Sequence, residues 1–491
     1  MCGMVKFDIP KEVTAVAATL EEAGFEAYLV GGCVRDLVLE KTPKDWDITT
    51  NATPEQIQPL FTETFYENAY GTVGVVTETD NPSVKVVEVT PYRKEGEYSD
   101  SRRPDTVEFG VSLSEDLKRR DFTINAIAYR PKTKEFVDEH EGQKDLENRL
   151  IRAVGDPTVR FEEDALRMMR AVRLSAELSF AIEQKTADAM YKKAENLSKI
   201  SKERIRDELV RILETDVPMQ GIFLAQRLGL LKYIAPDLER GIGIAQNQAH
   251  SFDVFEHLLR ALQHAADKKW AFAIRLAALF HDVSKPETRR WSDEKKDWTF
   301  YGHDVVGAKL TKKILKDLRF PAEVIEKTVK LVRWHMFFSD PDQVTLSAVR
   351  RVITNVGTEN IEDLLHLRIC DRIGTGRPKE QPFRLRKYMA MVDQALRDPI
   401  SVSMLAIDGK NVMEITGEKA GPRIGWILHA LLEEVLEDPQ KNTKDYLSEK
   451  TLVLSRLEDA ALREMGEEGR QARETAEEKE ISEIFKKHHV E

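Results

Sequence analysis

A glycine pair between a short apolar run and a helical stretch constrains the fold most. Within residues 27–50, AYLVGGCVRDLVLEKTPKDWDITT, the run Tyr28 to Val30 is predicted to be a buried strand that leads into Gly31 and Gly32. Glycine lets the backbone turn tightly with its amides bare, and amides at the start of a helix bind phosphate. The pattern therefore predicts a strand, an anion-binding turn and a helix that carries Arg35.

The same stretch continues with two carboxylates one residue apart. Asp45, Trp46, Asp47 and Ile48 alternate polar and apolar, so a strand would project both carboxylates to one face and both apolar side chains into the core. Two carboxylates can hold magnesium, which completes its shell with water and substrate phosphates. Alone, a glycine pair is more often an ordinary turn and a D-x-D pattern more often solvated surface. Together they predict phosphate chemistry.

The amino-acid composition is compatible with phosphate chemistry. The 491 residues should form several domains, and 74 Lys and Arg against 85 Asp and Glu make the chain acidic. Residues 431–491 hold ten Lys and Arg against seventeen Asp and Glu, so the rest is nearly balanced and can carry a basic face. We expect a cytoplasmic protein and no membrane partner, because Cys2, Cys33 and Cys370 lie far apart and no signal peptide or spanning run is present.

The periodicity changes along the chain. Up to about residue 155, β-like runs such as TVGVVTET, VKVVEVTPYR and AIAYRP alternate with turns, whereas from Arg160 onward most of the chain has the pattern of amphipathic helices. The predicted fold class is therefore α+β, with an α/β head before an all-helical remainder. Glycine and proline interrupt the pattern near residues 156–157, 241–243 and 374–378.

Two arginine-containing motifs strengthen the phosphate hypothesis. In the turn RRDFTIN, Arg120 could hold triphosphate oxygens in a bidentate fork, although such a turn is by itself an ordinary ion pair. The stretch Glu163 to Arg173 predicts one strong helix with Leu166, Met169 and Val172 facing inward. On it Asp164 and Arg167 would be neighbours, either as a helical ion pair or as an acceptor and donor for the polar edge of a base.

The motifs LVGGCVRD, DWDIT, RRDFTINAIAY, GDPTVRFEEDALRMMRAVR and SKERIRDEL, in this order and spacing, resemble class II tRNA nucleotidyltransferases, the CCA-adding enzymes. That family shares a superfamily with bacterial poly(A) polymerases. The resemblance is close over residues 25–215, and a later stretch, LAIDGKNVMEITGEKAGPRIGWILHALLEEVL, resembles the helical region that grips tRNA in relatives. It implies a polymerase-β-like nucleotidyltransferase head at 1–155, a helical neck at 156–240 and a helical body and tail at 379–491.

The resemblance also implies site residues. Asp45 and Asp47 would bind Mg²⁺, and Glu88 would orient or deprotonate the primer hydroxyl, so these three form the catalytic group. The residues that would bind the nucleotide are Gly31, Gly32, Arg35, Arg120, Asp164, Arg167, Arg170 and Arg173. Among them, Asp164 and Arg167 would act as a protein template for CTP and ATP. The implied partners are tRNA, CTP and ATP. The oligomeric state is left open.

A second constellation lies in residues 241–378, where His257, the pair His281-Asp282 and Asp371 follow one another. This H…HD…D order resembles the HD phosphohydrolase superfamily, which implies that the four residues are metal ligands. His303 and His335 are extra candidates. Imidazole with carboxylate is a first-row transition-metal shell, in which a bound water can attack phosphoesters. Ser284 stands where that superfamily usually has glycine, which makes the local backbone a point to examine.

Several functions remain open at this stage. The main expectation is addition of CCA to tRNA from CTP and ATP, with release of pyrophosphate, accompanied by phosphohydrolase activity in the HD domain. The alternatives are a CC-adding or A-adding tRNA nucleotidyltransferase, a bacterial poly(A) polymerase, or an HD phosphohydrolase with an RNA-binding head. The polar segment Tyr92 to Pro104 is predicted to be a loop, and in position it resembles the loop that lets relatives exchange CTP for ATP.

Overall fold

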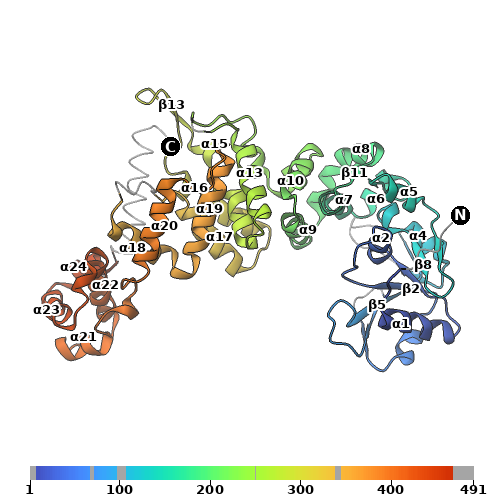
Figure 1. Cartoon of the computed structure of the whole chain (residues 1–491), viewed down its shortest axis with the longest axis horizontal. Coiled ribbons are helices and arrows are strands. Elements are labelled where there is room, and N and C mark those ends of the chain that lie inside the picture. The colour runs from blue at the N-terminus through green and yellow to red at the C-terminus, as the bar shows by residue number, and fades with distance from the viewer. Residues whose placement is uncertain (1–6, 67–70, 97–106, 249, 338–343, 468–491) are drawn as a thin grey trace. The chain divides into compact units, whose positions relative to one another are not determined.

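The chain divides into two compact units between Pro236 and Asp237, and each is described by itself. The computed structural model describes residues 7–66, 71–96, 107–248, 250–337 and 344–467 (Figure 1). No helix among these residues is long and apolar enough to cross a membrane. Residues 468–491, the last part of the predicted helical tail, lie outside the described residues.

The first unit is built on a seven-stranded sheet with the strand order β3-β4-β5-β2-β1-β8-β9. Its strands are β1 Tyr28–Val30, β2 Asp47–Thr50, β3 Thr64–Tyr66, β4 Val73–Val76, β5 Val86–Pro91, β8 Ala128–Arg130 and β9 Glu135–Val137. Neighbouring strands are antiparallel except β2 and β5, which run parallel with Asp47 opposite Glu88. The apolar runs predicted as strands form β1, β4, β5 and β8, so the mixed α/β head is confirmed.

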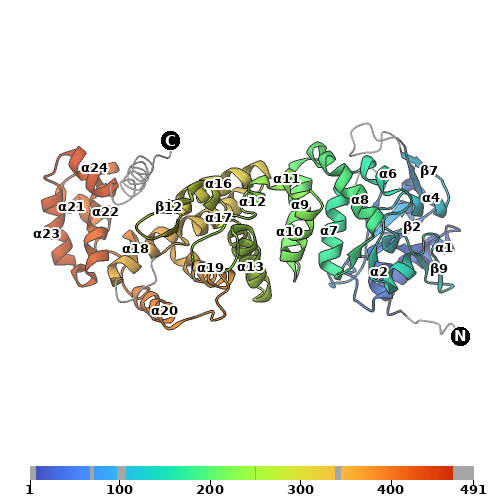
Figure 2. The same cartoon turned by 90° about the horizontal axis from the view of Figure 1, so that it is seen from above.

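The helices of the first unit lie before, between and after the strands of the sheet in the sequence. They are α1 Lys11–Glu22, α2 Gly32–Val38, α3 Pro54–Ile57, α4 Leu113–Lys118, α5 Gly142–Glu147, α6 Pro157–Glu163, α7 Leu166–Leu178, α8 Gln184–Lys193, α9 Lys202–Glu214, α10 Pro218–Arg227 and α11 Leu231–Ile234. Helix α2 packs on β1, and α7 packs on both α9 and α10 (Figure 2). Leu166, Met169 and Val172 of α7 are at most 6% exposed, as the helical pattern predicted. These apolar residues place α7 within the packed helical part of the first unit.

The second unit is almost entirely helical, from α12 Pro236–Glu239 at its border. Its further helices are α13 Val254–Asp267, α14 Phe272–Phe280, α15 Lys285–Thr288, α16 His303–Asp317, α17 Ala322–Trp334, α18 Leu346–Val356, α19 Ile361–Gly374, α20 Phe383–Ala395, α21 Gly409–Thr416, α22 Pro422–Glu437, α23 Lys444–Leu454 and α24 Asp459–Glu467. Helix α13 packs on α14 and α19, and α22 packs on α21, α23 and α24. Arg350 of α18 donates to the carbonyl oxygens of Leu436 and Glu437 at the end of α22, so these hydrogen bonds join α18 to α22.

Three two-stranded sheets were not predicted. They are β6 Arg93–Glu95 with β7 Val107–Phe109, β10 Leu150–Ile151 with β11 Ala181–Ile182, and β12 Arg290–Ser292 with β13 Asp297–Thr299. Such strands are too short for sequence periodicity to detect. The first sheet corrects the loop prediction, because Arg93 to Glu95 form a strand and Tyr92 is buried with its hydroxyl on Glu26. Residues 97–106 of that segment lie outside the described part.

Candidate active sites

The predicted turn after β1 brings three functional groups together. Gly31 has a φ of 80°, a left-handed conformation that favours glycine, and α2 begins at the next residue. A Cβ added at Gly31 would lie 3.4 Å from Nη1 of Arg120 and 3.5 Å from Oδ2 of Asp47. The turn therefore lies directly against a carboxylate and a guanidinium that are distant in sequence.

The two carboxylates of the D-x-D pattern do not share a strand. Trp46 and Ile48 are buried as predicted, but β2 begins only at Asp47, and Asp45 lies exposed in the bend before it. The prediction that Asp45 lies on the strand is wrong, because pairing with β5 begins at the register of Asp47 and Glu88. In a parallel pair, residues in register project to the same face. Asp47 and Glu88 are therefore the pair that the sheet aligns.

Electrostatics shows how closely these groups interact. Burial raises the pKa of Asp47, Arg120 lowers it, and the negative charge of Asp45 raises it further, with a net increase. Asp45, Asp47 and Glu88 do not form a group of three with ligand atoms all within 4.8 Å of one another in the part of the chain described. A cation beside Asp47 would relieve its desolvation. Oxygen ligands of this kind fit Mg²⁺, which takes few protein carboxylates.

Asp116, which the sequence analysis missed, holds Arg120, the arginine predicted to bind triphosphate. This fully buried carboxylate contacts Nη2 of Arg120 at 3.1 Å and Nη2 of Arg119 at 2.6 Å, and accepts a hydrogen bond from Thr49 on β2. Burial alone would raise the pKa of Asp116, but Arg120 and Arg119 outweigh it and lower this pKa. The i,i+3 and i,i+4 spacing in DLKRR was the available signal.

Hydrogen bonds link the turn to the helix α7. Nη1 of Arg35 donates to Asn125, whose amide donates to Asp121, and Arg170 of α7 donates to Asp121 through both Nε and Nη2. Burial would raise the pKa of Asp121, but Arg170 outweighs it and holds this pKa well below its usual value. Arg170, predicted to border the nucleotide, is thus held by an ion pair whose other member belongs to the RRD turn.

The predicted helix from Glu163 to Arg173 is broken. Helix α6 ends at Glu163, and Asp164 has an extended backbone with φ −141° and ψ 105°. Its carboxylate accepts from the amide of Leu166, where α7 begins. Aspartate competes with helix continuation in this way. The prediction of one continuous helix is therefore wrong, and Asp164 lies in the bend.

The two template candidates have separate partners. Asp164 pairs with Nη2 of Arg204 on α9 at 2.7 Å, whereas Arg167 pairs with Glu163 at 2.5 Å and donates to the carbonyl of Arg119. Sequence spacing had not indicated Arg204, because the partner lies forty positions away.

Arg173, the remaining arginine of the predicted nucleotide pocket, also forms ion pairs within the protein. It is 9% exposed, and its guanidinium lies between Glu208 of α9, at 2.8 Å from Nε, and Glu177, at 3.0 Å from Nη1. Arg173 therefore joins α7 to α9 in this structure. A direct contact with a nucleotide stays a prediction for Arg173.

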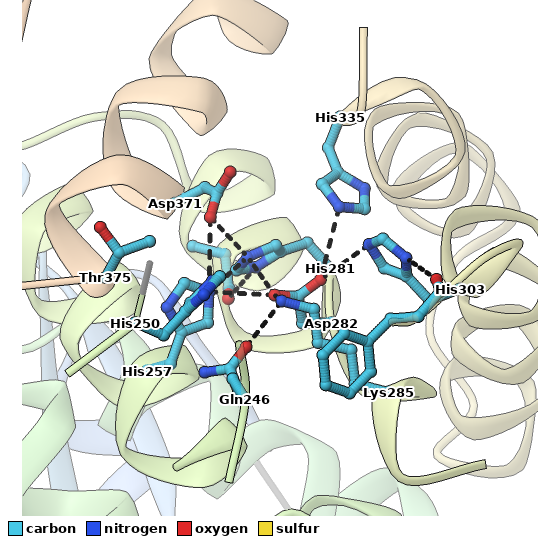
Figure 3. A network of polar contacts seen from close by, with 12 residues as sticks. Gln246, His250, His257, His281, Asp282, Lys285, His303, His335, Asp371 and Thr375 are labelled. Atoms are coloured by element: carbon cyan, nitrogen blue, oxygen red, sulfur yellow. Dashed lines mark hydrogen bonds and ion pairs between the residues drawn. The ribbon is translucent and has the colours of Figure 1, made fainter. Parts of the chain in front are cut away.

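In the second unit, the HD residues form a buried cluster. The ligand atoms of His257 on α13, His281 and Asp282 after α14, and Asp371 on α19 all lie within 4.8 Å of one another (Figure 3). Close packing makes this feasible, because a Cβ added at Gly374 of α19 would lie 2.8 Å from the His257 carbonyl oxygen. Burial alone would lower the pKa of His281, but the carboxylates of Asp282 and Asp371 raise it to about 9.

The extra candidates join the same cluster. Asp282, His303 at the start of α16 and His335 after α17 form a second group of close ligand atoms. Ser284 has a φ of −92°, which any residue adopts, and its hydroxyl donates to the His303 carbonyl. The change from glycine therefore introduces no backbone strain and adds a bond that holds His303.

Sequence reasoning missed two groups beside the cluster. Nζ of Lys285 lies 2.5 Å from Oδ2 of Asp282 and donates to Gln246. The imidazole of His250 stands edge-on to that of His257, with 5.3 Å between ring centroids. Burial is the largest cause of the lowered pKa of His250, about 3, and Lys285 adds to it. Both side chains line the cavity beside the cluster.

A cavity of about 950 Å³ opens from the cluster. Asp282, His303 and Asp371 lie in its wall, so the buried group is reachable by a ligand. Its other lining side chains are mainly cationic or aromatic and include Lys285, Arg368, Arg372, Arg377, Trp298, Tyr301 and Phe383. Cations with aromatic surfaces suit a phosphorylated ligand that carries a planar ring.

Three families of known proteins match successive parts of the chain. The families described as "Poly A polymerase head domain", "Probable RNA and SrmB- binding site of polymerase A" and "HD domain" match residues 27–152, 179–242 and 254–374. The CCA-adding enzyme of Lactobacillus helveticus is 34% identical over 89% of this chain and 96% of that protein. The A-adding tRNA nucleotidyltransferase of Deinococcus radiodurans is 35% identical over 67% of this chain and 76% of that protein.

A solved structure matches nearly the full length. The crystal structure of the Bacillus stearothermophilus CCA-adding enzyme in complex with CTP aligns with a TM-score of 0.68 at 27% identity. The alignment covers 91% of this chain and 98% of that one. The α/β head and the helical remainder therefore occur together in a protein that binds CTP.

Proposed function

Because this chain belongs to the CCA-adding enzymes, a family of tRNA nucleotidyltransferases, we propose that it completes the 3′ end of tRNA with C, C and A from CTP and ATP. The observation that carries the proposal is the convergence of Gly31, Asp47 and Arg120. In each step the terminal ribose hydroxyl attacks the α-phosphate, an oxygen–phosphorus bond forms, and pyrophosphate leaves. Such chemistry depends mainly on positioning and charge neutralisation.

The turn would hold the triphosphate. Amides at Gly31 and Gly32 open helix α2, and Arg35 is oriented beside them by Asn125. Nε of Arg120 is buried with no hydrogen-bond partner among the described residues. A phosphate oxygen would satisfy this donor, since a buried unpaired donor costs about 1–3 kcal/mol. Asp116 keeps the guanidinium in place by pairing with Nη2.

Asp45 and Asp47 would hold Mg²⁺, and Glu88 would orient the primer hydroxyl from the neighbouring strand. Register supports the last assignment, because Glu88 lies opposite Asp47. When bound, the ion would stabilise the charge that develops at the α-phosphate. The exposed position of Asp45 leaves one side of the site open for substrate.

The neck would select the base. Asp164 offers carboxylate oxygens and Arg167 a guanidinium, and each is held by its own partner, Arg204 or Glu163. We propose that these partners set the positions from which the pair meets the polar edge of cytosine or adenine. Arg170 and Arg173 would border the same pocket, oriented by the Asp121 and Glu208 carboxylates.

We further propose the functional division 1–155 for the catalytic head, 156–240 for the neck, 241–378 for the HD domain and 379–491 for a tRNA-binding body and tail. A cytoplasmic location fits the free, buried thiols of Cys33 and Cys370. The reaction test is incubation of purified protein with tRNA that lacks its 3′ end, with CTP and ATP singly and together. Three added nucleotides with both substrates support the proposal; a product that keeps growing with ATP alone would indicate a poly(A) polymerase.

The segment between β6 and β7 is proposed to switch the pocket from CTP to ATP. Glu95 and Val107 are paired in register, so an Asn-Gly turn can replace residues 96–106 without opening the hairpin. We expect the shortened protein to add CC at the normal rate and to lose addition of the final A, because the template pair must be repositioned between bases. In the control variant, a glycine–serine segment of the same length replaces residues 96–106. Terminal A addition at the wild-type rate in the shortened protein would show that this segment is only a linker.

A second activity is proposed for the HD cluster: metal-dependent hydrolysis of phosphomonoesters or 2′,3′-cyclic phosphates. The buried ligand set and the cationic cavity support it. Nε2 of His303, Nε2 of His335 and Oδ1 of Asp282 are buried without a hydrogen-bond partner among the described residues, so a first-row transition metal fits the group. Bound there, the metal would activate water and polarise the phosphoester.

The two activities should be separable. We expect His281→Ala combined with Asp282→Ala to abolish phosphoester hydrolysis and leave nucleotide addition within about twofold of wild type, because the clusters belong to different compact units. Asp47→Ala is the reciprocal control and should show the opposite pattern. Equal loss of both activities in the HD variant, with circular dichroism unchanged, would contradict separate sites.

A further inference from the structure

One row of residues crosses four strands of the sheet in the first unit. Glu88 of β5 lies opposite Asp47 of β2 on one side and Gly74 of β4 on the other, and Gly74 lies opposite Phe65 of β3. Residues directly opposite each other on neighbouring strands project to the same face of a sheet. Phe65 and Gly74 therefore share a face with Asp47 and Glu88, two carboxylates proposed for the chemical step.

The end of the phenyl ring of Phe65 lies over Gly74. A Cβ added at Gly74 would lie 2.5 Å from Cζ of Phe65, 2.8 Å from Cε1 and 2.9 Å from Cε2. Any other residue at position 74 would therefore displace the ring, so glycine is what leaves room for it. Because neighbouring strands lie about 4.8 Å apart, the end of the ring stands one strand from Glu88 and two from Asp47.

Phe65 is also accessible to a ligand. It is 42% exposed, and β3 is the outermost strand on this side of the described sheet. A single exposed aromatic residue is ordinary on a protein surface. Phe65 differs because it projects to the face on which the chemistry is proposed, and because a glycine in the next strand clears space for its ring. The ring thus offers accessible aromatic surface beside the proposed catalytic carboxylates.

The primer of the proposed reaction changes at every step. Before the first addition, a tRNA without CCA ends in a nucleotide that differs between tRNAs, and before the later additions it ends in C. Hydrogen-bonding groups that read one base would be left unpaired by another. Stacking on an aromatic ring tolerates every base, because each base has a π-face. An exposed ring is therefore the kind of group that can hold a primer end of changing identity.

The position of the ring also suits the attacking hydroxyl. A base stacked on Phe65 would lie over β4, with the Glu88 side chain on the adjacent strand. The ribose of that nucleotide would then reach Glu88, which is proposed to orient its 3′-hydroxyl, and Asp47 lies one strand further. Holding a nucleophile in place in this way lowers the entropic cost of the reaction.

We propose that Phe65 is the stacking platform for the terminal base of the RNA primer and that Gly74 makes room for its ring. The inference rests on the nucleotidyl transfer proposed above and adds the residue that positions the acceptor end. Phe65 acts on the base and leaves the reacting atoms to Asp47, Glu88 and the triphosphate site. It is thus a primer-positioning residue that should act before each of the three additions.

Kinetics at saturating CTP, with tRNA that lacks CCA, test the platform. We expect Phe65→Ala to lower kcat/KM for tRNA roughly 5- to 150-fold, the range that stacking of one base on an aromatic side chain provides. The KM for CTP should change less than about twofold, since the triphosphate site is separate. Phe65→Tyr and Phe65→Trp keep a π-face and should restore most of the rate. Tyr66→Ala removes a neighbouring exposed ring that strand alternation places on the opposite face, and should behave as wild type.

A primer without its terminal base gives the decisive measurement. Wild-type protein should use a tRNA whose last ribose carries no base about as poorly as Phe65→Ala uses intact tRNA. Replacing intact tRNA by abasic tRNA should cost Phe65→Ala less than about a further twofold, because two changes that remove one contact are not additive. Independent losses that multiply, or a Phe65→Ala rate on intact tRNA equal to wild type, would overturn the platform. Failure of wild-type protein to extend intact tRNA would instead refute the proposed nucleotide addition.

Discussion

Asp47→Ala is expected to reduce nucleotide incorporation at least about a thousand-fold, because charge stabilisation at the reacting phosphate is worth several kcal/mol. The carboxylate adjoins both the Gly31 turn and Arg120, and Glu88 lies opposite it on β5. Affinity for tRNA should change less than about twofold, since the phosphate backbone dominates such binding and Asp47 is negatively charged. Rapid-quench incorporation and filter binding measure the two quantities.

The matched control is Asp80→Ala, which removes an exposed aspartate between β4 and β5. It should incorporate nucleotides at the wild-type rate. Rates for Asp47→Ala within tenfold of wild type would refute the assignment of the catalytic carboxylate. Arg120→Lys should reduce incorporation by an intermediate amount, because lysine keeps the charge but loses the fork that contacts Asp116 and is proposed to hold the triphosphate.

Removing either member of the proposed template pair, Asp164 or Arg167, should weaken selection of CTP and ATP over UTP and GTP. We expect Asp164→Ala or Arg167→Ala to reduce discrimination against UTP and GTP by roughly 10- to 100-fold, since one well-placed polar pairing contributes about 1–3 kcal/mol of base discrimination. Competition experiments with labelled CTP and UTP give the ratio of kcat/KM values. The effect should exceed the loss of rate with the correct nucleotide.

The control for this prediction is a second Asp–Arg contact in the same helical region. Arg206→Ala and Asp207→Ala break a contact of 2.7 Å on α9 and should leave selectivity unchanged. Arg204→Ala should reduce nucleotide selectivity by less than Asp164→Ala does, because it frees Asp164 without removing its carboxylate. If Asp164→Ala and Arg167→Ala lose rate but keep full selectivity for CTP and ATP, these side chains only join the helices.

Local signals in the sequence were sufficient for the turn and the strands. The apolar run before Gly31 forms β1, and α2 begins at the next glycine, because both depend on neighbouring residues. The position of Asp45 was not predictable in this way. Strand pairing with β5 decides where β2 begins, and that pairing depends on residues forty-one positions away. Tyr92 was assigned to a polar loop for the same reason, although its hydroxyl reaches Glu26 across the fold.

Ion-pair partners were the least predictable features. Helical spacing suggested that Asp164 would meet Arg167, but the carboxylate caps the following helix and pairs with Arg204 instead. Aspartate often prefers a nearby amide to a helical position, and only the packed structure determines which guanidinium is within reach. In the second unit, the order of histidines and aspartates predicted a metal cluster. Its division into two sets around Asp282 depends on which oxygen faces which ring, and no sequence pattern reports that.

The most direct test of the central claim uses three tRNA substrates that end before the CCA, after one C and after CC. Each is incubated with purified protein, CTP and ATP, and the products are resolved at single-nucleotide length. Complete CCA synthesis predicts that all three substrates reach the same final length, with C added only from CTP and the last residue only from ATP. Extension of the CC-ending tRNA alone would contradict it and assign the chain the A-adding activity of its Deinococcus radiodurans relative.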